Sequence, residues 1–303
     1  MNKFLVAIFT YNRGRHLNNC VESLELNMKI PFDLVIYDDD STDKLTLDIL
    51  SSLRRKYLVV TNTSPGENSK VKGLYSNMNG AIEYGINGKY NYLQFLQDDV
   101  QLVREIDLDY LTSAETVFKN PEVFSISSMF FKKNHQVDFE KYLKFDTTSQ
   151  MYLPKSMEQK YMTGIADIGL FSLEKITQIN WRFEMDEALH IAKGREMGLI
   201  RGVTKNPHFS FLPWPSTSRS GFSLLKRVLM VVLDKWYNVG FHPLNSISEE
   251  SETKLQNRSL FDFPYAEDFL TTRDNSKLVT PWNFYDSFFP FKNSIKRLIK
   301  NNG

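Results

Sequence analysis

The chain has 303 residues, of which 42% are hydrophobic and 24% charged, and these shares are typical of a soluble globular protein. Lys and Arg number 37 against 36 Asp and Glu, so the formal charge of +1 excludes nucleic-acid binding driven by bulk charge. The single cysteine, Cys20, excludes an intramolecular disulfide and a cysteine-based zinc site.

The first predicted element is a strand, because an apolar run covers Phe4–Phe9. The run ends at polar Thr10 without the small-residue cleavage site of a signal peptide. Neither this run nor any other reaches the ~18 apolar residues of a membrane span. We therefore expect a buried first strand in a cytoplasmic protein.

Up to Val100 the sequence predicts regular alternation of strands and helices. The strands are short apolar runs without polar alternation, which is typical of parallel strands buried on both faces. The predicted strands are Phe4–Phe9, Leu34–Tyr37, Tyr57–Val60 and Tyr92–Leu96, and the predicted helices are His16–Leu26, Leu45–Arg55 and Leu74–Tyr84. This order predicts an α/β fold with a mostly parallel central sheet flanked by helices.

The second half of the chain is less regular. Its predicted elements are the strands Val123–Met129, Ala166–Phe171 and Leu199–Val203, the helix Asp186–Met197, and a mixed, irregular stretch over Phe130–Met162. An apolar helix over Phe222–Tyr237 and a basic amphipathic segment over Phe291–Lys300 follow. Ordinary packing and peripheral contact with a membrane surface both fit these last two segments. We expect one domain over residues 1–219, with halves 1–100 and 101–219, and a helical extension over 220–303.

Polar residues follow four predicted strands at their carboxyl ends. They are Thr10–Arg13, Asp38–Asp43, the loop Asn62–Gly73, and Gln97–Asp99. Ligands of open α/β sheets bind outside these ends, so we expect one shared site. Two strand ends crowded with carboxylates indicate a divalent cation that holds a diphosphate, although either pair alone also fits a solvated turn. Dinucleotide and P-loop sites are excluded, because no G-x-G-x-x-G follows the first strand and no G-x-x-x-x-G-K occurs.

Five segments follow one another in a consistent order: Val6–Arg13, Tyr37–Asp43, Asn77–Gly85, Leu96–Asp99, and Trp181 through Asp186-Glu187 to Gly198. They resemble the opening strand with its T-x-N-R turn, the D-D-G-S-x-D segment, the R-N-x-G-x-x-x-A-x-G helix, the D-x-D motif, and the later G-x-F and E-D elements of the family 2 glycosyltransferases with the GT-A fold. The resemblance covers roughly Phe4 to Arg219. Asp40 stands where Gly is usual, and Gln97 stands where Asp is usual.

The resemblance implies transfer of a sugar, with inversion, from a nucleotide-activated donor, which we expect to be a UDP-sugar. Asp39 would accept a hydrogen bond from N3–H of uracil, and Thr10 and Asn12 would line the same pocket. Arg13 would donate to a phosphate. The alternatives are a helix-capping role for Asp39 and a surface position for Arg13.

The resemblance also implies a metal ion, Mn²⁺ or Mg²⁺, coordinated by Asp99 next to Asp98. Gln97 would hydrogen-bond the ribose, but it brings no charge and so weakens the affinity for metal. His208 follows a short strand where many GT-A enzymes supply another metal ligand. A histidine that is merely packed is the alternative for His208.

An inverting transfer needs a base for the acceptor hydroxyl. Asp186-Glu187 occupies the place of the E-D pair in reversed order, which makes Glu187 the expected base and Asp186 its neighbour or substitute. Both acids also suit the first turn of a helix. The expected acceptor is a glycan or a lipid-linked glycan of bacterial surface polysaccharide synthesis, handled by a cytoplasmic enzyme that also contacts the inner face of the membrane.

Two other functions remain open at this point. A sugar nucleotidyltransferase would use a similar sheet and a carboxylate-bound metal, but it would need a glycine-rich basic turn after the first strand. Residues Thr10–Arg15 contain one glycine, Gly14. A non-catalytic nucleotide- or glycan-binding module on the same scaffold fits Gln97 and the reversed acidic pair.

Overall fold

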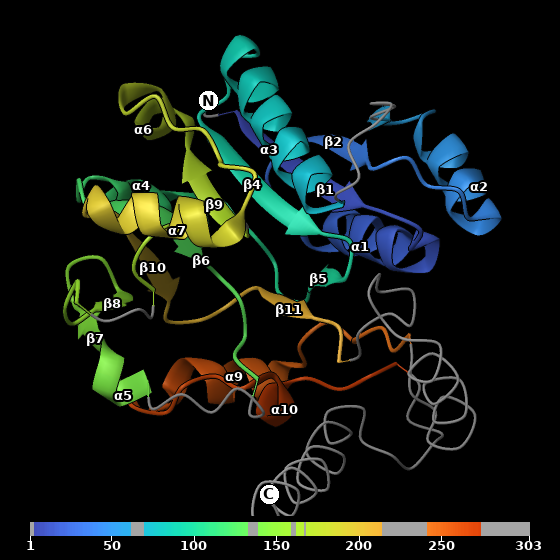
Figure 1. Cartoon of the computed structure of the whole chain (residues 1–303). Helices are drawn as coiled ribbons and strands as arrows, with labels where there is room; N and C mark the ends of the chain where they lie inside the picture. The colour runs from blue at the N-terminus through green and yellow to red at the C-terminus, as the bar shows by residue number, and fades with distance from the viewer. Residues whose placement is uncertain are drawn as a thin grey trace, which may run out of the picture.

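The computed structural model describes residues 3–61, 70–132, 139–158, 162–166, 168–213 and 241–273, and it shows a central sheet with helices packed on both faces (Figure 1). The strands are β1 (Phe4–Thr10), β2 (Asp33–Asp38), β3 (Leu58–Thr61), β4 (Tyr92–Gln97), β5 (Val100–Leu102), β6 (Val123–Ser127), β7 (Leu143–Asp146), β8 (Met151–Pro154), β9 (Gly169–Ser172), β10 (Ile200–Thr204) and β11 (Phe209–Phe211). The helices are α1 (Gly14–Asn27), α2 (Lys44–Leu53), α3 (Lys70–Asn87), α4 (Leu108–Phe118), α5 (Phe139–Tyr142), α6 (Leu173–Gln178), α7 (Glu187–Glu196), α9 (Glu249–Asn257) and α10 (Ala266–Phe269).

The central sheet has nine strands in the order β3-β2-β1-β4-β9-β6-β10-β8-β7. Neighbours among β3, β2, β1 and β4 are parallel, as are β6 and β10, whereas β9 runs antiparallel between β4 and β6. β11 and β5 form a separate antiparallel pair. The expected fold class, α/β with a mostly parallel central sheet flanked by helices, is confirmed.

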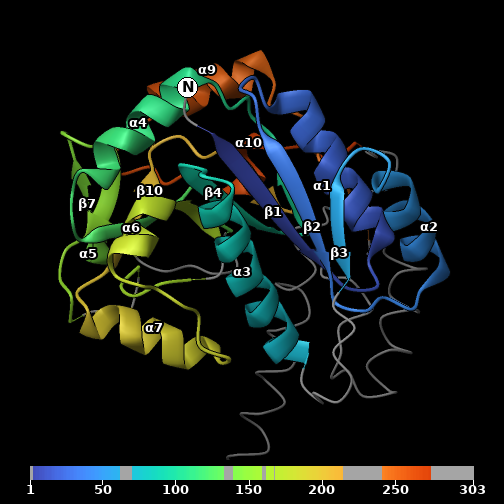
Figure 2. The same cartoon turned by 90° about the horizontal axis from the view of Figure 1, so that it is seen from above.

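The central strands are mostly apolar because both of their faces are covered. On β1 the side chains of Val6 and Ile8 join the cluster that contains α1, α2 and α4, while Leu5 and Ala7 join the cluster that contains α3 and α6. Figure 2 shows these two helical layers on opposite sides of β1 and β2. Every residue of β1 is buried. The unbroken apolar run thus follows from a strand with no solvent-facing side.

The stretch Phe130–Met162, expected to be irregular, contains α5 and the hairpin of β7 and β8. All four residues of β8 are buried, and Met151 and Tyr152 pair with β10, while β7 forms the edge of the sheet. The turn between β7 and β8 places Gln150 at a φ of 55°. The hairpin lacks the usual glycine or Asn-Gly signal at this turn, which explains why the sequence did not predict it.

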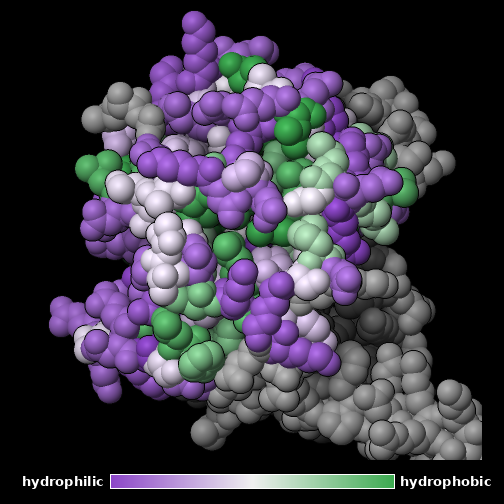
Figure 3. Space-filling view, turned by 90° about the vertical axis from the view of Figure 1, so that its left-hand side faces the viewer, coloured by the Kyte–Doolittle hydropathy of each residue, from purple (hydrophilic) through white to green (hydrophobic). Residues whose placement is uncertain are grey.

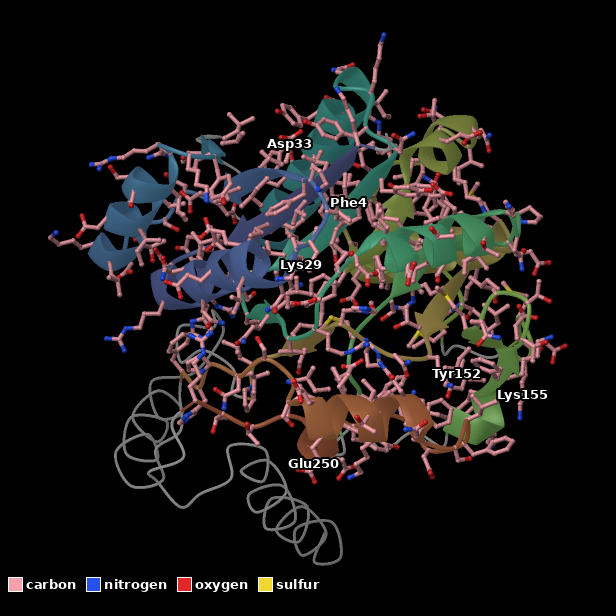
Figure 4. The ribbon with its side chains drawn as sticks, turned by 180° about the vertical axis from the view of Figure 1, so that it is seen from behind. Phe4, Lys29, Asp33, Tyr152, Lys155 and Glu250 are labelled. Carbon is pink, nitrogen blue, oxygen red and sulfur yellow. The ribbon has the colours of Figure 1, made fainter. Side chains whose placement is uncertain are left out.

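Residues 241–273 pack against the residues next to the strand pair of β5 and β11. Apolar residues of this segment and of the β5–β11 region share one cluster: Val103, Phe130, Leu212, Leu244, Leu255, Ala266, Phe269 and Leu270. Arg104, just after β5, donates to Glu252 of α9 through Nε at 2.6 Å and Nη2 at 2.5 Å. Glu250, labelled in Figure 4, lies on the exposed side of the same helix.

The segments Phe222–Tyr237 and Phe291–Lys300 lie outside the described residues, so their expected helical structure and membrane contact stay predictions, as does the expected domain boundary at residue 219. In the part of the chain that the structure describes, no helix is long and apolar enough to span a membrane.

Candidate functional site

The carboxyl ends of β1, β2 and β4 lie side by side. Asp38 of β2 pairs with Thr10 of β1, and Phe9 pairs with Gln97 of β4. The ladder continues one residue further on each side, because Asp39 N donates to Thr10 O at 3.0 Å and Asp98 N donates to Phe9 O at 3.1 Å. The two acidic strand ends therefore flank the carboxyl end of β1. Phe4 and Asp33, labelled in Figure 4, begin β1 and β2 and so mark the opposite ends of these strands.

Asp98 directly follows β4 at this edge and is only 3% exposed. Its Oδ2 accepts a hydrogen bond from Thr10 Oγ1 at 2.9 Å, and its Oδ1 accepts one from Arg13 Nη1 at 3.0 Å. Burial raises the pKa of Asp98 to about 6; the Arg13 charge opposes this shift and the neighbouring Asp99 adds to it. The carboxylate is thus directed into the protein and fixes Thr10 and Arg13.

Asp99 has one engaged and one unengaged oxygen. Its Oδ2 accepts from Arg13 Nη1 at 3.3 Å, so a single guanidinium nitrogen bridges both carboxylates. Its Oδ1 is buried, and none of the described residues provides it with a hydrogen-bond partner. A buried carboxylate oxygen without a partner is unfavourable, and a cation is the ligand that would satisfy it.

The residues around Asp99 fit a divalent ion of the oxygen-preferring kind. Among the described residues no group of three or more His, Cys, Asp or Glu side chains forms a complete metal cage. Mg²⁺ is commonly held by one or two carboxylates together with substrate phosphates and water. Asp99 Oδ1 would therefore be the protein ligand of such an ion. Gln97 lies two residues earlier, half-buried at the end of β4.

The side chain of Asn12 bonds to the loop after β2, and its expected place in a nucleotide pocket stays a prediction. Its Oδ1 accepts hydrogen bonds from the backbone N–H groups of Thr42 at 2.7 Å and Asp43 at 2.9 Å, and its own N donates to Ser41 Oγ at 2.8 Å. Asn12 therefore ties the turn after β1 to the loop after β2.

The loop after β2 is also fixed from inside. Asp38 is fully buried, and its two carboxylate oxygens accept from Ser41 Oγ at 2.5 Å and Ser41 N at 3.1 Å. Asp40 adopts a φ of 58°, the left-handed conformation that favours glycine. This explains why Gly is usual at that position of the family motif. Asp39, between these two residues, is half-buried.

The structure does not bring His208 to Asp99. The register of β11 and β5 pairs Phe209 with Leu102 and Phe211 with Val100, which puts His208 opposite Val103. Four residues along a strand correspond to about 13 Å. His208 Nδ1 lies 3.0 Å from Ser128 Oγ, and its Nε2 lies 3.4 Å from Arg104 Nη1.

Burial, together with the charge of Arg104, lowers the pKa of His208 well below its ordinary value. The imidazole is therefore neutral and packs edge-on against the ring of Tyr110 at 4.8 Å. The geometry favours the packed histidine over the metal ligand, and we do not include His208 in the proposed metal site.

Asp186 and Glu187 begin α7, as their spacing suggested. Asp186 is the N-cap, and its Oδ1 accepts from Ala188 N at 2.8 Å and Leu189 N at 3.2 Å. Glu187 is exposed in the first turn, next to the exposed apolar side chains of Met185 and Leu189. The side of the molecule that carries α6 and α7 shows a mixture of hydrophilic and hydrophobic residues (Figure 3).

Trp181 is a core residue. It is 1% exposed, and its ring packs against Phe124 at 5.5 Å and Phe183 at 5.9 Å. Lys193 Nζ lies over its ring at 4.9 Å. Most of the loop 62–73, which was expected at the shared site, lies outside the described residues, as does the segment 214–219.

Residues 5–114 match the model of the family described as glycosyl transferase family 2, which agrees with the resemblance stated from the sequence. A comparison with curated proteins finds no match.

Similar solved structures include S. aureus TarS 1-349, with 14% identity, a TM-score of 0.47, and coverage of 70% of this chain and 60% of that one. The same TarS fragment in complex with UDP-GlcNAc has 16% identity, a TM-score of 0.45, and coverage of 69% and 58%. The mannosyltransferase PcManGT from Pyrobaculum calidifontis, in complex with GDP-Man and Mn²⁺, has 15% identity, a TM-score of 0.45, and coverage of 76% and 64%. The chain thus spans about 60% of the length of TarS 1-349.

Proposed function

From the match of residues 5–114 to the glycosyl transferase family 2 model, we propose that the chain is an inverting glycosyltransferase that moves a sugar from a UDP-sugar to a hydroxyl group. The observation that carries the proposal is that Asp39 and the Asp98-Asp99 pair flank the end of β1 on one edge of the sheet. The acceptor we propose is a glycan or a lipid-linked glycan, in bacterial surface polysaccharide synthesis.

The base of the donor would be read at Asp39. A carboxylate accepts a hydrogen bond from N3–H of uracil, which cytosine lacks. Asp39 is half-buried at the strand end, and the bonds of Asn12 and Asp38 to Ser41 hold its loop in one shape. A preorganised loop loses little entropy when the nucleotide binds.

The diphosphate would lie beside Asp99. A Mn²⁺ or Mg²⁺ ion bound there supplies positive charge that stabilises the departing nucleoside diphosphate. Arg13 holds the carboxylates of Asp98 and Asp99 in place through its ion pairs with both. In this role Arg13 orients the acidic pair, and Gln97 at the end of β4 is the group proposed to bond the ribose.

Glu187 is the proposed base. Its carboxylate is exposed at the start of α7, whereas Asp186 Oδ1 accepts two backbone N–H groups of the same helix. Glu187 would take the proton from the acceptor hydroxyl while that oxygen bonds to the anomeric carbon and the bond to the UDP oxygen breaks. Attack opposite to the leaving group inverts the anomeric centre.

The test is release of UDP from a panel of UDP-sugars, with Mn²⁺, with Mg²⁺ and with EDTA, both without acceptor and with a panel of glycans. We expect at least one UDP-sugar to be turned over. UDP binding without turnover of any donor would instead indicate a non-catalytic binding module, which the uncharged Gln97 also fits. If calorimetry detects no binding of UDP at all, the proposal is wrong.

A further inference from the structure

The segment between α6 and α7 has no secondary structure of its own between Trp181 and Glu184. Its backbone N–H and C=O groups therefore need partners from elsewhere. Asn79 of α3 supplies both partners for one residue: its Nδ2 donates to Phe183 O at 2.9 Å, and its Oδ1 accepts from Phe183 N at 2.9 Å. One side-chain amide thus bonds this peptide as a neighbouring strand would.

Packing around the same point reinforces the pair of hydrogen bonds. The ring of Phe183 is 2% exposed and stacks on Tyr75 of α3 at 6.3 Å, with the ring of His190 of α7 at 5.2 Å. Tyr75 and His190 also contact each other edge-on at 4.7 Å.

Two ion pairs lie at the margins of this packing. Arg182 Nη1 lies 2.5 Å from Glu83 Oε1 of α3, and Lys193 Nζ of α7 lies 2.8 Å from Glu184 Oε1. The segment is therefore held between α3 on one side and α7 on the other, and it ends three residues before Glu187.

α3 also reaches the donor side of the site. Its first turn carries Gly73, whose backbone lies directly against the carboxylate of Asp39. A single helix therefore contacts the residue proposed to read the base and, two turns later, bonds the segment that leads to the proposed catalytic carboxylate.

We propose that Asn79 is a positioning residue for the transfer: it fixes Phe183, and through it the start of α7, so that Glu187 is held at the reacting hydroxyl. This inference rests on the proposed function of Glu187 as base. Asn79 touches no reacting atom. Its loss therefore leaves UDP affinity intact and lowers the rate of the chemical step, because small displacements of a reacting group are costly.

The experiment is a double-mutant cycle with Asn79→Ala and Glu187→Gln, using the UDP-sugar from the panel that gives the fastest UDP release. Asn79→Ala is expected to lower kcat on the order of tenfold in the wild-type background. In the Glu187→Gln background it is expected to change the residual rate by less than about twofold, because the group that it positions is no longer a base. Asn87→Ala, an exposed asparagine on the same helix, is the matched control and should leave kcat unchanged.

Hydrogen exchange provides a readout that does not depend on turnover. In Asn79→Ala, faster exchange should be confined to residues 181–190, with the Kd for UDP unchanged. Equal losses of kcat in both backgrounds, exchange unchanged from wild type, or a loss of UDP affinity as large as the loss of kcat would each overturn the inference. A wild-type protein that binds UDP but releases none from any donor would instead overturn the proposed function, and with it the role of Asn79 in catalysis.

Discussion

The carboxylate of Asp39 lies against the α-carbon of Gly73: a β-carbon at position 73 would be 2.2 Å from Asp39 Oδ1 and 2.8 Å from both Cγ and Oδ2. The first turn of α3 therefore accommodates the carboxylate only because residue 73 has no side chain. The requirement is one of space, since the nearest atoms all belong to a single side chain.

Gly73→Ala should therefore displace the Asp39 carboxylate without unfolding the protein. If Asp39 bonds the uracil ring, the loss of a hydrogen bond to a charged group, worth about 1.5–3 kcal/mol, predicts a Kd for UDP raised roughly tenfold to a hundredfold. Calorimetric titration with UDP measures the change, and Asp39→Asn should produce a similar loss.

Gly80→Ala is the matched control on the same helix, because a β-carbon there would meet the Tyr37 ring at an ordinary 3.6 Å. It should leave the Kd for UDP unchanged and stabilise α3 by up to about 1 kcal/mol. Equal UDP affinity in wild type, Gly73→Ala and Asp39→Asn would remove Asp39 from the nucleotide site.

Asp99→Asn should abolish the dependence of UDP binding on metal. The buried Oδ1 is the oxygen proposed to coordinate the ion, and an amide is a much weaker ligand than a carboxylate for a hard cation. In wild type, Mn²⁺ should tighten UDP binding over that measured in EDTA, and in Asp99→Asn the two affinities should converge. Asp109→Asn, an exposed acid on α4, serves as control; a variant at position 99 that keeps the full Mn²⁺ response would exclude this ligand.

Glu187→Gln and Asp186→Asn should separate catalysis from helix capping. Loss of a general base typically lowers kcat by about 10²- to 10⁴-fold, which we expect for Glu187→Gln with little change in melting temperature. Asn caps helices about as well as Asp, so Asp186→Asn should retain both stability and most activity. The reverse order of effects in steady-state kinetics would transfer the role of base to Asp186.

Lys175 predicts a dependence of stability on pH. Its Nζ donates to Asn120 O at 2.5 Å and Val123 O at 2.7 Å, and burial, opposed by the charge of Glu174, lowers its pKa from 10.5 to about 8. Between these two values the unfolded chain binds more protons than the folded one, so stability should rise as pH increases from about 8 to about 10.5.

The measurement compares urea unfolding of wild type with that of Lys175→Met across this range. The free energy of unfolding of wild type, relative to the variant, should increase with pH above 8 and be constant below it. A difference that falls with rising pH would show that the ammonium group is stabilised, not destabilised, in the folded protein.

Much of the fold of residues 1–100 was predictable because the central strands there lack a solvent-facing side. The runs Phe4–Phe9 and Tyr92–Leu96 each became a strand within one residue of the expected bounds, β1 and β4. The edge of the sheet was harder. β7 carries exposed positions and mixed composition, so its apolar residues do not form a run that stands out from a loop.

The site was predictable in its location and less so in its individual roles. A sequence motif places Asn12 at the strand end, but it does not predict the φ of 52° or the hydrogen bond from the backbone N–H of Asn12 to Ser41 Oγ. The ion pairs of Arg13 with Asp98 and Asp99 were not expected from the sequence, and its contact with a phosphate stays a prediction. The bond of Asn79 to Phe183 joins residues 104 positions apart, and no local pattern signals such a contact.

The insertion of β9 between β4 and β6 means that the two halves of the domain cannot be separated as independent pieces. A fragment ending near residue 100 would expose the hydrogen-bonding edge of β4 that pairs with β9, and the side chains of β4 lack the charges that keep free edges from pairing. Such a fragment would tend to self-associate edge to edge. Exchange of donor halves between related chains would therefore have to carry the antiparallel strand along with the first four.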